Sequence, residues 1–227
     1  MEPILSPRLL AAAKLVRQGA VLSDVGTDHA LLPAYLLKEG RIKSAIASDI
    51  VKGPLQRAEE TVKKYGLKSK VTTLLTPGLQ GVEEYAPTDI VIAGMGGQTI
   101  AEIVGDAPFV KNSGIRLILQ PMTKGELLRE FLSGAGFVIE KECRIREEHR
   151  IYTLICAHYE GTPYDLSPLE LLFGRVKKEE RDELYFSLLE KKKEQLLQVT
   201  EAKRKNGVDA EQENALLALI EKELSEK

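Results

Sequence analysis

The stretch that decides the fold is Ala20–Pro33, "AVLSDVGTDHALLP". Its first six residues are short and apolar, which is typical of a buried strand. The residues that follow the loop, "ALLPAYLLKEG", indicate a helix in which Pro33 is tolerated only within the first turn. Gly26 comes two residues after Asp24 at the end of the strand, as glycines do in loops that bind nucleotides. A strand, a glycine loop and a helix in this order predict the first unit of an α/β fold.

The same alternation extends to both sides of this stretch. Ser6 and Pro7 are an N-cap and a first-turn proline, so a helix is expected over "RLLAAAKLV". Further helices are expected at "LQRAEETVKKYG" and "TKGELLREFLSGAG", and further strands at "SAIASDI", "KVTTLLT", "DIVIAG" and "RLILQP". "FVIEKECRIREE" and "RIYTLICAHYE" leave no room for a helix between them, so they form an antiparallel pair. We therefore expect a mostly parallel sheet, covered by helices on both faces, that ends in an antiparallel hairpin.

The composition changes near residue 163. Ser167, Pro168 and Glu170 form a capping box, and the charged, proline-free sequence up to Lys205 predicts one helix of about 38 residues. "NGVD" then turns the chain, and Asp209 with Gln212 caps a second helix. The apolar side chains that recur at coiled-coil spacing are Leu189, Leu196, Val199, Leu217, Ile220 and Leu224. The sequence predicts two domains, an α/β domain of residues 1–162 and an antiparallel helical coiled-coil domain of residues 163–227.

Composition limits the classes of function. Of the 227 residues 29% are charged, and the formal net charge of −2 excludes nucleic-acid binding by bulk charge alone, although a local basic groove stays open. Cys143 and Cys156 are the only cysteines and have no metal-ligand spacing, so we predict no metal site. No apolar run approaches the roughly 20 residues of a membrane span, and the first residues do not resemble a signal peptide. We expect a cytoplasmic protein.

Three features fall at strand ends, where ligands bind in open α/β sheets. They are the loop Asp24–His29, Asp49 at the end of the second strand, and "AGMGG" at Ala93–Gly97. Asp49 can accept hydrogen bonds from a ribose diol, and glycines let backbone amides come close to a ligand. Each feature alone is also explained by a turn or a helix cap. Together they indicate a cofactor that contains a nucleoside.

The loop argues against a dinucleotide. A pyrophosphate loop needs two further glycines, whereas this chain has Asp28 and Leu31 there, and Asp28 repels a pyrophosphate. A nicotinamide oxidoreductase is therefore disfavoured. S-adenosylmethionine has a sulfonium, an ammonium and no phosphate, so it avoids this conflict. Asp24 near the amino-acid end and Asp49 at the ribose suit it.

Several motifs together carry a family resemblance. The terminal hairpin resembles that of the class I methyltransferases, which have a Rossmann-like sheet. "SPRL", "DVGTDHALLP", "ASDI", "IAGMGG", "LILQP" and "RIYTLI" resemble the bacterial TrmK family over the whole chain, including the C-terminal helices. That resemblance implies transfer of a methyl group from S-adenosylmethionine to N1 of adenine 22 in the D-arm region of tRNA, with S-adenosylhomocysteine as the product. The chain departs from the family at "TPGL", where the family tends to have "GDGL", and at Met122, where a polar residue is usual.

The resemblance also implies roles for residues. It places Asp24, Gly26, Thr27, Asp28 and His29 at the methionine end of the cofactor. It places Asp49 and Ile50 at the ribose, and the sulfonium and target base along Gly94, Met95, Gly96 and Gly97. Because Pro77 has no side-chain acceptor, recognition of the adenine ring depends on Gly78 and Leu79. Gln120, Pro121 and Met122 border the pocket of the target base.

The same resemblance defines the catalytic hypothesis. N1 of adenine attacks without prior deprotonation, so orientation is the main task. Asp28 is expected to stabilise the positive charge that develops on the purine, and His29 to contact N6 or the cofactor carboxylate. The alternative for His29 is a cap of the following helix.

Basic residues suggest how tRNA is held. Arg8, Lys14 and Arg17 have roughly helical spacing on the first helix and can form a phosphate-binding stripe, although a solvated face also explains them. Lys191–Lys193 and Lys203–Lys205 lie on the C-terminal helices. We expect tRNA as the partner of a monomer or weak dimer, with no membrane. Two alternatives stay open, a class I methyltransferase acting on another RNA or a small molecule, and a non-catalytic adaptor with this fold.

Overall fold

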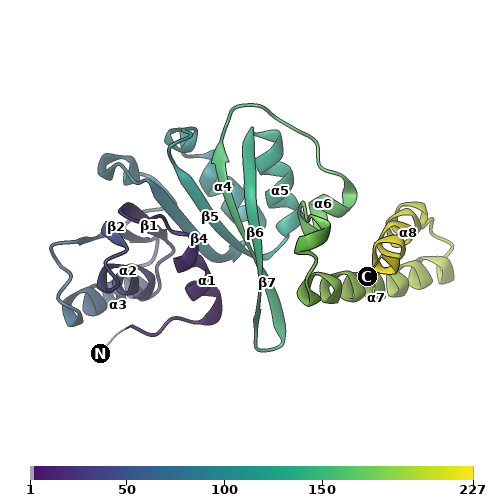
Figure 1. The fold of residues 1–227 in the computed structure, drawn as a ribbon, viewed down its shortest axis with the longest axis horizontal. Helices are drawn as coiled ribbons and strands as arrows, with labels where there is room; N and C mark the ends of the chain where they lie inside the picture. Colours follow the sequence, from purple (N-terminus) through teal and green to yellow (C-terminus); the bar gives the residue numbers. More distant parts are fainter. Residues whose placement is uncertain (1–2, 227) are drawn as a thin grey trace. The chain divides into compact units, whose positions relative to one another are not determined.

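The computed structural model describes residues 3–226 and divides the chain into two compact units after Tyr164. The first unit contains one seven-stranded sheet in the order β3-β2-β1-β4-β5-β7-β6 (Figure 1). Its strands are β1 Ala20–Val25, β2 Ile42–Asp49, β3 Val71–Leu75, β4 Asp89–Gly96, β5 Arg116–Thr123, β6 Phe137–Glu147 and β7 Arg150–Tyr159. In the described sheet β7 runs antiparallel to both of its neighbours, β5 and β6, and all the other pairs of neighbouring strands are parallel. The predicted parallel sheet with a terminal antiparallel hairpin is confirmed.

The strand order reverses between β1 and β4. From β1 the chain builds outward through β2 to β3, and it then returns to place β4 on the other side of β1. Asp24 of β1 lies opposite Ala47 of β2 and Val91 of β4. The loops that follow these three strands therefore emerge side by side at the carboxyl edge of the sheet, which is where α/β proteins bind ligands.

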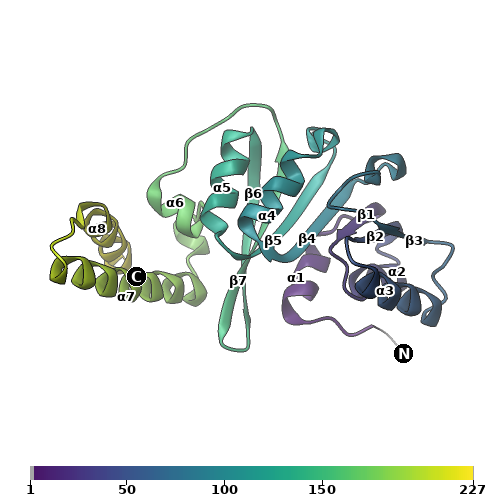
Figure 2. The same cartoon turned by 180° about the vertical axis from the view of Figure 1, so that it is seen from behind.

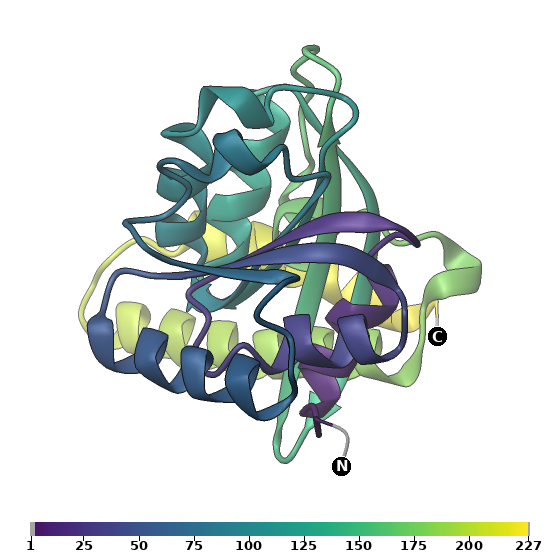
Figure 3. The same cartoon turned by 90° about the vertical axis from the view of Figure 1, so that its left-hand side faces the viewer.

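Five α-helices cover the two faces of the sheet. On one face lie α1 Pro7–Leu15, α2 Leu31–Lys38 and α3 Lys52–Lys64, and on the other lie α4 Gly97–Gly105 and α5 Gly125–Gly134 (Figures 2 and 3). Two short 3-10 helices, Val82–Tyr85 and Pro108–Val110, belong to the same unit. Along β4, Val91 packs into the core of the first face, and its neighbours Ile90 and Ile92 pack into that of the second. Strands buried on both faces are continuous apolar runs, as the sequence shows.

Local signals set most helix ends in the first unit. The Ser6 hydroxyl accepts a hydrogen bond from the Leu9 amide at 3.5 Å, and Pro7 is the first residue of α1. Pro33 is the third residue of α2 and therefore lies in the first turn. The helix α4, which begins in the glycine-rich "GMGG" segment, was not predicted from the sequence. Ile100 and Val104, four residues apart, anchor it in the core.

The second unit consists of α6 Pro168–Phe173, a 3-10 turn Lys178–Glu180, α7 Glu183–Lys205 and α8 Glu211–Ser225. The capping box at Ser167 is confirmed. The prediction of one helix from Pro168 to Lys205 is wrong, because Gly174 ends α6 at a φ of +84°. The Asp182 side chain then begins α7 by accepting from the Tyr185 amide at 2.8 Å. No helix in the described residues is long and apolar enough to cross a membrane.

The helices α7 and α8 pack as an antiparallel pair. Three ion pairs of 2.6–2.8 Å join them: Lys203–Glu213, Lys193–Glu221 and, just before α7, Arg181–Glu223. The later a residue lies in α7, the earlier its partner lies in α8, which is the pattern of an antiparallel pair. Leu189, Leu196 and Ile220 are buried in the seam between the helices. Val199, which was expected there, is 43% exposed and does not belong to the seam.

Candidate active site

The loop after β1 is held by Thr27. Its hydroxyl donates to the Asp24 carboxylate at 2.6 Å and accepts from the Ala30 amide at 3.1 Å. Its backbone amide donates to the Ser48 carbonyl on β2 at 2.9 Å. Gly26 turns the loop with a φ of +71°, a conformation that favours glycine. Thr27 thus joins the loop to β1, to the start of α2 and to the neighbouring strand β2.

Asp24 is a buried carboxylate with no positive partner among residues 3–226. Its residue is 8% exposed, and Thr27 is its only side-chain hydrogen-bond donor among the described residues. Burial raises the pKa of Asp24 to about 6, and the hydrogen bond from Thr27 offsets only part of this effect. A buried anion without a counter-charge is unfavourable by itself and is suited to a cationic ligand.

Asp28 and His29 lie together in the exposed part of the loop. One Asp28 oxygen is 3.4 Å from His29 Nε2, and the other accepts from the Arg57 guanidinium on α3. The N-cap of α2 is Ala30, and in the part of the chain that the structure describes no side chain forms a cap hydrogen bond with this helix, so His29 is not a helix cap. Arg57 was not among the residues predicted from the sequence. Its ion pair with Asp28 ties the loop after β1 to the helix after β2.

Asp49 ends β2 and shapes the next loop. Its Oδ1 accepts from the Val51 amide at 2.7 Å, which is the turn leading into α3, while Oδ2 has no hydrogen bond within the described residues. Ile50 is 68% exposed beside it. The Asp49 carbonyl accepts from the Thr76 amide at 3.0 Å and so holds the segment that contains Gly78 and the buried Leu79.

The glycines at the end of β4 and the start of α4 have different roles. Gly94 is exposed, and its amide donates to Gln120 Oε1 at 3.1 Å. Met95 covers the loop after β1, because a Cβ on Gly26 would lie 2.2 Å from the Met95 methyl group. Gly96 is the N-cap of α4. A Cβ on Gly97 would lie 2.1 Å from a backbone carbonyl oxygen just before α5, so this glycine permits close packing inside the protein.

Gln120 connects three elements at the end of β5. It is 1% exposed, and its Oε1 accepts from both the Gly94 amide and Arg8 Nη1, the latter at 3.3 Å. Arg8 also donates to the Met122 sulfur at 3.1 Å. The next residue along β5, Pro121, is buried. Gln120 therefore fixes the "GMGG" loop against α1.

The predicted basic stripe on α1 does not form. Arg17 lies beyond the end of the helix and donates to Asp89 at 2.8 Å and to the Gly114 carbonyl at 2.8 Å. These partners lie at the start of β4 and just before β5, at the amino edge of the sheet, whereas Arg8 is at the carboxyl edge. Lys14 is exposed near the end of α1. Burial of Asp89 requires a nearby cation, and Arg17 is that cation.

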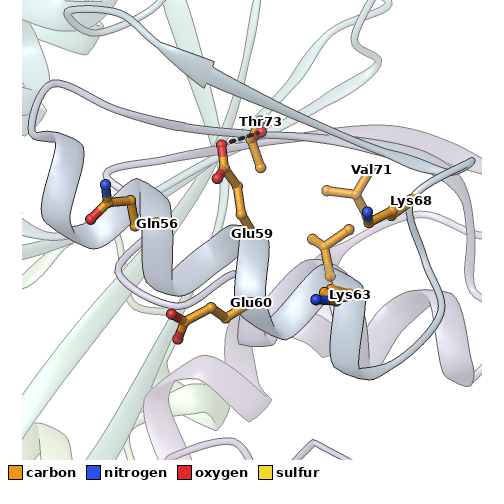
Figure 4. Close-up of a pocket in the computed structure, with 8 residues that line it drawn as sticks. Gln56, Glu59, Glu60, Lys63, Lys68, Val71 and Thr73 are labelled. Atoms are coloured by element: carbon orange, nitrogen blue, oxygen red, sulfur yellow. Dashed lines mark hydrogen bonds between the residues drawn. The ribbon is translucent and has the colours of Figure 1, made fainter.

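A cavity of about 310 Å³ lies where the ends of β1 and β4 meet the start of α1, and Asp49, Ile50, Gly78 and Leu79 are outside its lining. It is lined by Arg8, Leu9, residues 24–32, Ala93 and Gly94. A larger cavity of about 550 Å³ lies between α3 and β3 (Figure 4), lined by Gln56, Glu59, Glu60, Val62, Lys63, Lys68, Val71 and Thr73. This second cavity contains none of the predicted site residues and carries charges of both signs. The smaller cavity, at the point where the strand order reverses, is the candidate active site.

The fold and the site define the class of protein, that of the Rossmann-like methyltransferases. A family model described as "Methyltransferase domain" matches residues 5–155. The tRNA (adenine(22)-N(1))-methyltransferase of Bacillus subtilis is 35% identical over 153 residues, which are 67% of this chain and 64% of the relative. A crystal structure of a provisionally assigned tRNA (m1A22) methyltransferase from Streptococcus pneumoniae, in complex with S-adenosyl-L-methionine, is 34% identical with a TM-score of 0.85. It covers 97% of this chain and 100% of that one.

A second solved structure is also similar to this chain over nearly its whole length. That of Mycoplasma capricolum TrmK, in complex with S-adenosyl-homocysteine, has a TM-score of 0.81 at 29% identity and covers 97% of this chain and 98% of that one. The chain belongs to the TrmK family of methyltransferases.

Proposed function

We propose that the protein transfers a methyl group from S-adenosylmethionine to N1 of adenine 22 of tRNA. The observation that carries this proposal is the buried Asp24 carboxylate, without a cation of its own, in the cavity between the ends of β1 and β4. It suits the ammonium group of S-adenosylmethionine. The Bacillus subtilis relative is a tRNA (adenine(22)-N(1))-methyltransferase, and the two solved structures named above contain the cofactor or its product.

Residues of the cavity and of the neighbouring loops at the carboxyl edge of the sheet fit this cofactor. Asp24 would hold the ammonium group, and the open Oδ2 of Asp49 would hold the ribose hydroxyls. The exposed Ile50 and the segment of Gly78 and Leu79 would contact the adenine ring. Once bound, S-adenosylmethionine supplies an electrophilic methyl group on its sulfonium.

The remaining residues of the loop act on the target base. N1 of adenine carries an available lone pair, so the protein needs no general base and acts chiefly by orienting the ring. Because Arg57 holds one oxygen of Asp28 and His29 lies near the other, we assign His29 to face the base and Asp28 to orient His29. Asp28 also contributes negative charge beside a purine that becomes cationic.

A pocket for the target base adjoins the cofactor site. Met95 over Gly26 and Met122 beside Arg8 are its apolar side chains. Since N1 is inaccessible in a stacked base, the adenine must leave its stack to enter this pocket.

The test of the activity is incubation of unmodified tRNA with methyl-labelled S-adenosylmethionine, followed by mapping of the modified nucleotide. We expect label at adenine 22 and none in a tRNA that carries another base there. Label at a different position, in another RNA or in no RNA would reject the proposal.

We further propose that the C-terminal helices, from residue 165 rather than 163 onward, form a separate helical domain that contacts tRNA, and that the protein acts in the cytoplasm as a monomer or weak dimer. Tyr164 belongs to the first unit, since its amide donates to the Ser133 carbonyl at 3.2 Å. A chain cut after Asp165 should keep its affinity for S-adenosylmethionine and lose affinity for tRNA. Unchanged tRNA affinity would contradict this role of the C-terminal helices.

A further inference from the structure

The hairpin of β6 and β7 is longer than the strand beside it. The two strands pair from Phe137 opposite Tyr159 to Glu147 opposite Arg150. In contrast, β7 pairs with β5 only over Ile155, Cys156 and Ala157, and Ile155 is the paired residue nearest to the closed end of the hairpin. At about 3.4 Å per residue, the closed end of the hairpin lies about 20 Å beyond Ile155. Figure 1 shows this end projecting past the other strands of the sheet.

The projecting end lies at the carboxyl edge of the sheet. Because β7 runs antiparallel to β5, the residues before Ile155 extend past the end at which β5 reaches Met122. A direct contact confirms this placement. The Arg8 guanidinium lies 5.3 Å from the centre of the Tyr152 ring, and the same Arg8 bonds Met122 and lines the candidate active site. The hairpin end is therefore next to the mouth of that site.

The hairpin end is basic where the cavity is acidic. It contains three arginines and two glutamates, Arg144, Arg146, Glu147, Glu148 and Arg150. Glu147 is already engaged, because it accepts from the Arg8 amide at 3.1 Å and pairs with the Arg8 guanidinium at 3.5 Å. Arg146 and Arg150 are exposed, and their side chains make no hydrogen bond or ion pair with any described residue.

These two arginines lie on opposite faces of the hairpin. Residues that are directly opposite in an antiparallel pair share a face, and consecutive residues alternate. Arg150 is opposite Glu147, which follows Arg146 in the chain, so Arg146 and Arg150 point to different sides. One cation on each side allows the hairpin to contact phosphate groups on both of its flanks.

We propose that the closed end of this hairpin binds RNA phosphate groups through Arg146 and Arg150, which positions the nucleic acid at the mouth of the active site. The inference rests on the proposed function for the identity of the RNA. A target base has to reach a cavity that contains Asp24 and Asp28, which repel the phosphates on either side of it. Cations on the rim offset this repulsion, and Arg17, which was expected to help, is held by Asp89 at the other edge of the sheet.

The test compares two double variants of the full-length protein in binding to unmodified tRNA. The first is Arg146→Gln with Arg150→Gln. The matched control is Lys68→Gln with Lys70→Gln, the same charge change at two exposed lysines just before β3, at the amino edge. Circular dichroism and thermal unfolding check that both are folded, and calorimetry with S-adenosylmethionine checks the cofactor site.

The hairpin variant should bind tRNA more weakly, with a slope of log affinity against log salt that is smaller by about one unit per arginine. Between 50 and 200 mM salt the unaltered protein should therefore lose about ten-fold more affinity than the variant. The lysine control should keep the original slope. Affinity for S-adenosylmethionine should be unchanged in both.

Three results would overturn the inference. They are an unchanged salt slope in the hairpin variant, an equal loss in the lysine control, which would indicate bulk charge, and failure of the unaltered protein to bind tRNA. Failure of the hairpin inference is distinguishable from failure of the proposed function. Methylation at adenine 22 with an unaffected hairpin variant rejects only the hairpin, and specific loss of tRNA binding without methylation rejects only the proposed reaction.

Discussion

Replacement of Asp24 by asparagine should raise the free energy of unfolding and lower the affinity for S-adenosylmethionine. Asparagine has nearly the same shape, and its side-chain oxygen can still accept the hydrogen bond that Thr27 donates at 2.6 Å. What disappears is the buried negative charge. Function at this position thus conflicts with stability, as is common at active sites.

The size of the effect follows from the pKa of Asp24. Burial raises it from 3.8 to about 6, and a difference of about two units corresponds to about 3 kcal/mol between the two states of the carboxyl group. Because the folded-state pKa is the higher one, stability from the protonated form is complete below pH 3.8 and is lost as the pH rises through about 6. The variant should gain about 3 kcal/mol at pH 8 and about half of that at pH 5.

Urea unfolding at pH 8 and pH 5 measures the stability difference, and calorimetry at pH 8 measures cofactor binding. We expect affinity for S-adenosylmethionine to fall by about ten-fold to a hundred-fold, since a hydrogen bond to a charged group is worth about 1.5–3 kcal/mol. Asp49→Asn, at a less buried carboxylate, is the control and should bring no gain in stability. A variant no more stable than the original at pH 8, or one with unchanged cofactor affinity, would refute the reasoning.

Three further changes test ion pairs and packing in the first unit. Arg129→Met should cost about 3–5 kcal/mol in urea unfolding, because it strands the buried Glu142, which Arg129 contacts at 2.7 Å; adding Glu142→Leu should restore most of the loss. Gly97→Ala should destabilise the protein by about 1–3 kcal/mol through its clash with a backbone carbonyl, whereas Gly134→Ala, with open space around it, should not lower the melting temperature. Arg57→Gln should barely change the melting temperature, because the ion pair of Arg57 with Asp28 is exposed. It should nevertheless raise the KM for S-adenosylmethionine by freeing the loop after β1, and Arg57→Lys should bring the KM part of the way back.

The sheet was predictable because its signals are local. Strands buried on both faces are apolar runs, and the chain has no residues to spare for a helix between β6 and β7. Helix starts such as Ser6–Pro7 and Ser167–Pro168 depend on side chains that bond amides only three residues away. Such signals do not require knowledge of the rest of the fold.

The two errors in the helices have physical causes. The residues that begin α4 include Gly96 and Gly97, which oppose a helix locally, and only the core contacts of Ile100 and Val104 stabilise it. The charged sequence after α6 favours a helix throughout, but Gly174 stops it and Asp182 begins the next one. Gly174 and Asp182 were both visible in the sequence, but the helix-forming composition of the segment outweighed them in the prediction.

The position of the candidate site was predictable from the sequence, but the ion pairs that its residues form were not. Chain order alone places Asp24, Asp49 and Gly94 at neighbouring strand ends. The contact between Arg57 and Asp28 joins residues 29 positions apart, and that between Arg17 and Asp89 joins residues 72 positions apart. Such partners are set by tertiary packing, which no local pattern encodes. The missing counter-charge of Asp24 is a property of the folded state for the same reason.

The packing of α1 has a consequence for synthesis on the ribosome. This helix packs against β6 and β7, and the Arg8 amide bonds Glu147, which is 139 residues further along the chain. At about 5–20 residues per second, the ribosome needs about 7–28 s to make that stretch. During this time α1, which carries the buried Ala12 and Ala13, lacks the contacts that β6 and β7 make with it in the finished protein. The first helix to be made is therefore among the last to find its place, and a nascent chain stalled before β7 exposes an apolar surface to chaperones.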